Sequence, residues 1–203
     1  MKDWSLLIQG LGVVGTIFVS ILAIWGEWFR SKCAAPKLSL HPHLLLKGTV
    51  TRFSNGPRVI YYHLKVVNAR TWATATNCRV LLRAIYRRGP DQQFHQLPMA
   101  VPLQFVWAPA ELTPPVVRIS AEQILDFGCI AENEDAFQPV LYSYTNNFDG
   151  YVHKNEAIRY SLEIIADRYM AKQYYTVEVA WNGVWADNLD EMARNLMIRE
   201  IVP

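Results

Sequence analysis

The sequence lacks the short motifs that identify many enzymes and cofactor-binding proteins. It contains no glycine-rich phosphate loop, no Gly-x-Ser-x-Gly elbow, no His-Glu-x-x-His pair and no Cys-x-x-Cys pair. Only three cysteines occur in 203 residues, and the odd number and wide spacing of Cys33, Cys78 and Cys129 differ from a secreted disulfide framework. We therefore predict that the protein is not an enzyme, uses no cofactor and holds no metal ion.

Charged side chains are absent from Trp4 to Gly26. At about 1.5 Å per residue, a helix over this stretch would cross a hydrocarbon core of roughly 30 Å. The charged residues Glu27 and Arg30 directly after the stretch are untypical of a cleaved signal peptide and favour a retained anchor. We therefore predict a transmembrane anchor helix over residues 1–29 and a juxtamembrane linker over residues 30–36.

Basic residues predict the orientation of this anchor. More of them follow the apolar stretch than precede it, and those that follow are Arg30, Lys32, Lys37 and Lys47. By the positive-inside bias, the amino terminus lies outside and residues 37–203 form a cytoplasmic domain. The predicted localisation is the inner membrane, in a single pass, with membrane lipid as a partner.

Small and polar residues recur at steps of three and four within or beside the apolar stretch. They are Gln9, Gly12, Thr16, Ser20, Ala23 and Glu27. On a helix they would form one narrow face that lets a second helix approach closely. This pattern predicts a homo-oligomer formed by self-association of the transmembrane helices. A further possibility is that the associated helices form a pore. The alternative is that these residues face lipid without consequence.

The rest of the chain shows the period-two hydrophobic pattern of β-strands. The clearest segments are Ile60–Val66, Val80–Tyr86, Tyr160–Ala166 and Tyr175–Trp181. Weaker patterns cover Leu38 to His41, Leu44 to Phe53, Leu103 to Trp107, Gln123 to Phe127 and Val140 to Tyr144. Strands and turns at this spacing predict a mainly β fold, with a β-sandwich after the anchor.

A short helix is predicted near the C-terminus. Asp187 is placed to cap it, and Leu189, Met192, Ala193 and Leu196 fall on one face. We expect this apolar face to dock on the domain, because an exposed stripe of this kind promotes aggregation.

Several stretches resemble known β-sandwich domains. Ala157 to Ala180 resembles the last two strands of immunoglobulin-like and fibronectin-like sandwiches, with Tyr160 in the place of a tyrosine corner. With Tyr62 to Asn68, Asn77 to Tyr86 and the W-x-G-x-W-x-D pattern of residues 181–187, the chain is similar to uncharacterised prokaryotic proteins with one amino-terminal span and a cytoplasmic sandwich. The resemblance implies an immunoglobulin-like fold and no particular activity.

Acidic residues are absent from Trp28 to Pro90, which contains twelve Lys or Arg. Residues 91–203 contain seven basic and sixteen acidic residues, so a near-neutral chain has parts of +12 and −9. Three interpretations are open. In the first, the strand arginines pair with Glu163 and Asp167 on a neighbouring strand. In the second, the first cations of the segment lie near an anionic membrane. In the third, the cations bind an anionic ligand.

The third interpretation defines a hypothetical basic face. Its residues are His63, Lys65, Arg79, Arg83 and Arg87. Cations would contact phosphate groups and the flat side chains between them would contact a base, which fits a nucleotide or nucleic acid.

These patterns predict a membrane-anchored binding or adaptor module. It would self-associate through its span and recognise a cytoplasmic protein partner through the sandwich. The alternative is a ligand-gated membrane effector, for example of a bacterial antiphage defence system, that senses a nucleotide or nucleic acid at the basic face.

Overall fold

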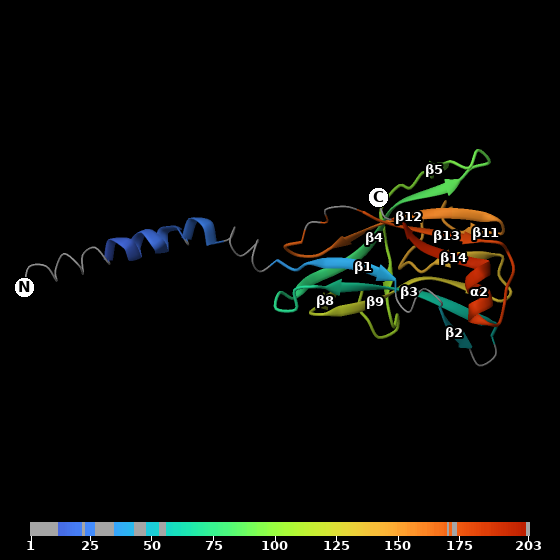
Figure 1. The fold of residues 1–203 in the computed structure, drawn as a ribbon, viewed down its shortest axis with the longest axis horizontal. Coiled ribbons are helices and arrows are strands. Elements are labelled where there is room, and N and C mark those ends of the chain that lie inside the picture. Colours follow the sequence, from blue (N-terminus) through green and yellow to red (C-terminus); the bar gives the residue numbers. More distant parts are fainter. Residues whose placement is uncertain are drawn as a thin grey trace, which may run out of the picture. The chain divides into compact units, whose positions relative to one another are not determined.

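The computed structural model describes residues 12–21, 23–26, 35–42, 48–52, 56–169, 171 and 174–201. The chain divides into two compact units, Met1–Ala35 and Pro36–Pro203. In the first unit, residues 12–21 and 23–26 are helical. The second unit contains the strands, together with a short helix near its end (Figure 1).

The predicted transmembrane anchor is not found. A membrane-spanning helix needs about 20 predominantly apolar residues. Over the residues that the structure describes, no helix combines the length and the apolar character that crossing a membrane requires. The predicted single-pass topology and inner-membrane localisation, with an outside N-terminus and a cytoplasmic domain, are therefore wrong.

One antiparallel sheet of the second unit contains seven strands. They are β1 (Leu38–Pro42), β2 (Thr49–Arg52), β3 (Arg58–Asn68), β7 (Val106–Trp107), β9 (Glu122–Ala131), β10 (Ala136–Pro139) and β11 (Val152–His153). The order is β1-β3-β9-β10-β11, with β2 also paired to β3 and β7 to β9. We call it the β3 sheet.

The other antiparallel sheet also contains seven strands, and we call it the β4 sheet. They are β4 (Ala75–Arg88), β5 (Phe94–Gln96), β6 (Leu103–Gln104), β8 (Val117–Ile119), β12 (Glu156–Ile165), β13 (Tyr175–Trp181) and β14 (Leu196–Ile201). The order is β14-β13-β12-β4-β5, and β6 and β8 pair with β4 (Figure 1). The connection from β3 to β4 therefore passes from one sheet to the other.

The inner faces of the two sheets share one hydrophobic core. Alternate residues of β3 are buried, including Tyr62 and Leu64, because successive side chains of a strand point to opposite faces. Phe127 of β9 contacts Tyr160 of β12 edge to face, with ring centroids 5.7 Å apart, and so joins the sheets. This mainly β, two-sheet architecture is compatible with the predicted β-sandwich.

Two β-bulges change the direction of side chains along the central strands. On β9, Phe127 has no partner because Tyr62 pairs with Gly128 and His63 pairs with Asp126. On β4, Arg83 has no partner because Ala84 pairs with Ser161 and Leu82 with Leu162. Beyond each bulge the inward and outward positions exchange.

Tyr160 links β12 to the loop before it. Its buried hydroxyl donates a 2.6 Å hydrogen bond to the carbonyl oxygen of Gly150, ten residues upstream. A tyrosine corner makes this kind of bond. The geometry is consistent with a tyrosine corner at Tyr160, as the resemblance implies. That this chain is related to the proteins it resembles stays a prediction.

The C-terminal helix α2 spans Leu189–Asn195. Asn188 caps it, because its side-chain oxygen accepts hydrogen bonds from the backbone N–H groups of Asp190 and Glu191. The prediction that Asp187 is the cap is wrong: its carboxylate lies 2.7 Å from Nη1 of Arg58. Met192 is fully buried, which confirms that the apolar face docks on the domain.

Candidate functional site

The structure does not bring the five residues of the predicted basic face together. His63 and Lys65 lie on β3, whereas Arg79, Arg83 and Arg87 lie on β4, in the other sheet. The two groups therefore do not share the outer face of one sheet. A ligand cannot use all five residues as a single surface.

Both β3 residues lie against carboxylates. Nδ1 of His63 is 2.8 Å from Oδ1 of Asp126, and Nζ of Lys65 is 3.0 Å from Oε2 of Glu122. Each pair joins β3 to the neighbouring strand β9. These contacts compensate the positive charge of this part of the predicted face.

The three arginines of β4 differ in their surroundings. Arg83 forms an ion pair with Glu163. Arg87 follows the bulge and therefore no longer shares the orientation of Arg83; its guanidinium donates to Asp149 at 2.9 Å. Arg79 is exposed and makes no ion pair with any residue within the described ranges.

The basic first part of the sequence and its acidic second part therefore largely pair with each other in the folded domain. Cations of the basic segment meet carboxylates of the acidic segment in the pairs Arg58–Glu132, Lys65–Glu122, Arg83–Glu163 and Arg87–Asp149. The first of the three interpretations is confirmed for Arg83 and Glu163. Asp167 instead accepts hydrogen bonds from Thr76 and Asn77.

A groove of about 520 Å³ lies on the outer face of the β3 sheet. Its floor is formed by side chains of β2, β3 and β9, namely Thr49, Thr51, Tyr61, His63, Ile124 and Asp126. One residue of the predicted face, His63, therefore lines a real concavity. Lys65 and the three arginines do not.

The segment after β7 forms the wall of this groove. Residues 108–112 line it, and the backbone N–H of Leu112 donates to the carbonyl oxygen of Pro109 at 3.1 Å. Ala108 is fixed to the floor through its N–H, which donates to Ile124 O at 3.0 Å. Leu112 is 83% exposed at the lip, and Glu111 adds a carboxylate.

The His63–Asp126 pair supplies the fixed polar group of the floor. The Asp126 side chain is only 9% exposed, and that of His63 is 19% exposed. The Asp126 carboxylate therefore faces the imidazole of His63, beside Tyr61 and Ile124 in the floor of the groove. Burial, with the nearby Cys129 and Asp126, raises the pKa of Tyr61. Like any tyrosine hydroxyl, that of Tyr61 is protonated at neutral pH and can donate a hydrogen bond.

Cys129, opposite Tyr61 in the β3–β9 register, is a free thiol near this site. Burial, followed by the charges of Glu134 and Asp126, raises its pKa to about 11. Because the thiolate is the reactive form, Cys129 is a poor nucleophile at neutral pH. The arrangement favours binding over cysteine chemistry.

Alkylation provides a direct check of this thiol. In the folded protein at pH 8 we expect Cys129 to react with iodoacetamide at least about tenfold more slowly than in the urea-unfolded chain, because its raised pKa leaves little thiolate. The rate is expected to rise about tenfold per pH unit while the pH stays below the pKa. Peptide mass spectrometry measures the modification; equal rates in the two states would contradict the expectation.

The predicted self-association face lies partly in the described helix. Gly12, Thr16, Ser20 and Ala23 are exposed there, while Gln9 and Glu27 lie outside the described residues. The hydroxyls of Thr16 and Ser20 donate to backbone oxygens four residues earlier, at 2.9 and 2.8 Å. Self-association stays a prediction, but its transmembrane setting is overturned.

Other candidate sites offer less chemistry. A hollow of about 810 Å³ between residues 96–100 and 145–147 is lined by uncharged side chains. Across the described ranges, no group of three His, Cys, Asp or Glu residues has the proximity that a metal ion needs. The groove with His63 and Asp126 therefore remains the best candidate site.

The sequence contained no local signal for this site. His63 and Asp126 belong to strands that are far apart along the chain and become neighbours only when β3 pairs with β9. A scan against models of protein families finds no match for the chain, and a search of curated proteins finds no match either. The function is therefore argued from this geometry.

Proposed function

We propose that the domain is a binding module that recognises a protein partner through the groove on β2, β3 and β9. The supporting observation is the buried Asp126 carboxylate, which lies 2.8 Å from Nδ1 of His63 in the floor of an otherwise largely apolar concavity. Binding sites typically combine apolar lining with a few fixed polar groups. Such a groove suits a partner side chain with an apolar body and a polar end.

Site-specific photocross-linking tests this proposal. A benzophenone amino acid at Leu112, on the lip of the groove, is expected to form an adduct with one partner in cells that naturally make the protein. The same substitution at Val184 is the matched control, because Val184 is also exposed and does not line the groove. Mass spectrometry of the adducts identifies the partner.

A second variant shows whether the groove itself makes the contact. Changing His63 to Gln in the Leu112-labelled protein removes the imidazole and is expected to reduce adduct yield about tenfold, as the loss of one hydrogen bond predicts. Adducts that are the same at Leu112 and Val184, or that are insensitive to the His63 change, would refute the proposal.

A further inference from the structure

Asn68, at the end of β3, holds three chain segments together at one end of the domain. Its buried side-chain oxygen accepts hydrogen bonds from the backbone N–H groups of Lys37 and Arg70, both at 3.1 Å. Its Nδ2 donates to the carbonyl oxygens of Ala73 at 2.7 Å and Ile119 at 3.3 Å. The start of β1, the β3–β4 turn and the end of β8 therefore lie side by side.

A fourth segment, the turn after β12, joins this end of the domain. The backbone N–H of Asp167 donates to the carbonyl oxygen of Thr76 at 2.9 Å. The joined segments and the beginning of strand β4 carry four exposed cations. They are Lys37, Arg79, Arg118 and Arg168. None of these four forms an ion pair with a residue that the structure describes, whereas the Asp167 carboxylate accepts from Thr76 and Asn77. Positive charge is therefore in excess here.

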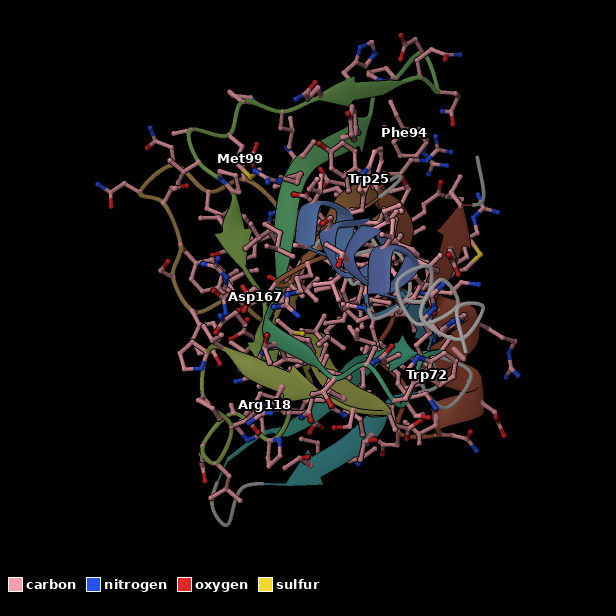
Figure 2. All side chains as sticks on the ribbon, turned by 90° about the vertical axis from the view of Figure 1, so that its left-hand side faces the viewer. Trp25, Trp72, Phe94, Met99, Arg118 and Asp167 are labelled. Carbon is pink, nitrogen blue, oxygen red and sulfur yellow. The ribbon has the colours of Figure 1, made fainter. Side chains whose placement is uncertain are left out.

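Trp72 adds a flat aromatic surface to this charge. It lies in the β3–β4 turn and is 74% exposed. Figure 2 looks onto this end of the domain and shows Trp72 on one side of it, with Arg118 of β8 and Asp167 of the turn after β12 on the other. Exposed aromatic rings beside cations are the elements with which proteins bind single strands, because the ring stacks on a base and the cations contact phosphates.

We propose that this surface, formed by Lys37, Trp72, Arg79, Arg118 and Arg168, binds single-stranded nucleic acid. Stacking on Trp72 requires an unpaired base, which a single strand presents and an intact duplex does not. The surface shares no residue with the groove around His63. Its activity is therefore separable from the proposed recognition of a protein partner.

Fluorescence anisotropy with the full chain tests this inference. The probes are a labelled oligothymidylate of about 12 nucleotides and an abasic strand of equal length, which keeps the phosphates and lacks the bases. Trp72→Ala is expected to weaken oligothymidylate binding about tenfold and to leave the abasic strand unaffected. Arg118→Gln combined with Arg168→Gln is expected to weaken binding of both probes. It is also expected to reduce the slope of log K against log salt concentration by about 1.4, because two phosphate contacts are removed.

A matched pair of substitutions controls for net charge. Lys154→Gln with Arg194→Gln also removes two positive charges, but at exposed positions outside this surface. This double variant is expected to leave binding almost unchanged. Equal losses for the two double variants, or unchanged oligothymidylate binding by Trp72→Ala, would overturn the inference. Because these side chains are exposed, circular dichroism is expected to show the same melting temperature for all variants.

Discussion

Replacing Phe127 by alanine is expected to lower the free energy of unfolding by about 3–5 kcal/mol. Phe127 is fully buried, and its ring lies 5.8 Å from that of Phe105, 5.8 Å from that of Phe137 and 5.7 Å from that of Tyr160. The truncation would leave a cavity between the sheets and remove the ring contact that joins them. Domains of this size are stable by about 5–15 kcal/mol, so a large share would be lost.

Urea unfolding followed by circular dichroism measures this loss as a lower midpoint with an unchanged slope. Phe94→Ala is the matched control, because Phe94 is only partly buried and its ring contacts the Arg159 guanidinium at 3.7 Å. A cation–π contact at such a site contributes about 0.5–1 kcal/mol. Similar losses for the two variants would contradict a core centred on Phe127.

Replacing Arg159 and Arg199 together by methionine is expected to lower the free energy of unfolding by about 3–5 kcal/mol at pH 7. Both arginines bind Glu178, whose side chain is only 3% exposed. Nε of Arg159 donates to one carboxylate oxygen at 2.7 Å, and Nη2 of Arg199 donates to the other at 2.6 Å. The double variant would leave this carboxylate buried without a cation.

The pH dependence of the loss identifies its cause. Burial acts to raise the pKa of Glu178, but hydrogen bonds from Arg159 and Arg199 outweigh it, so the pKa lies below its usual value. In the wild type, the stabilisation is therefore present above the unfolded-state pKa and is lost as the pH falls. In the double variant burial acts alone, the pKa is raised, and stability is lost as the pH rises instead.

The two proteins are thus expected to differ most near pH 7 and to converge as the pH falls through the lowered pKa of Glu178 in the wild type. Urea unfolding at a series of pH values measures the difference. Arg118→Met with Arg168→Met is the control, because these exposed arginines have no ion pair among the described residues. A difference for the Glu178 site that is constant with pH would show that lost packing, and not the charge, is responsible.

The strands were predictable because β-strands leave a local signal. Three of the four clearest period-two segments lie within β3, β4 and β13, and the fourth, Tyr160–Ala166, lies in β12 except for Ala166, which forms an isolated bridge. The weaker prediction for Val140–Tyr144 is wrong, since only Leu141 forms an isolated bridge, with Phe105. β14 was missed because Leu196–Ile201 follows α2 directly and its apolar and polar residues do not alternate along the sequence.

The candidate sites were less predictable, because they depend on pairing between distant strands. The spacing of Arg79, Arg83 and Arg87 suggested one face, but the bulge at Arg83 turns Arg87 toward Asp149. Periodicity also does not show that β3 and β4 belong to different sheets, which separates His63 from these arginines.

The pairing of an early basic segment with a later acidic segment has a consequence for synthesis on the ribosome. Arg58 and Glu132 are 74 residues apart, Arg83 and Glu163 are 80 apart, and Arg87 and Asp149 are 62 apart. The nascent chain therefore exposes a strongly basic stretch until Glu132, Asp149 and Glu163 emerge. Such distant contacts slow folding. The half-made domain is also a polycation, whose net charge falls only as the acidic second part, residues 91–203, is translated.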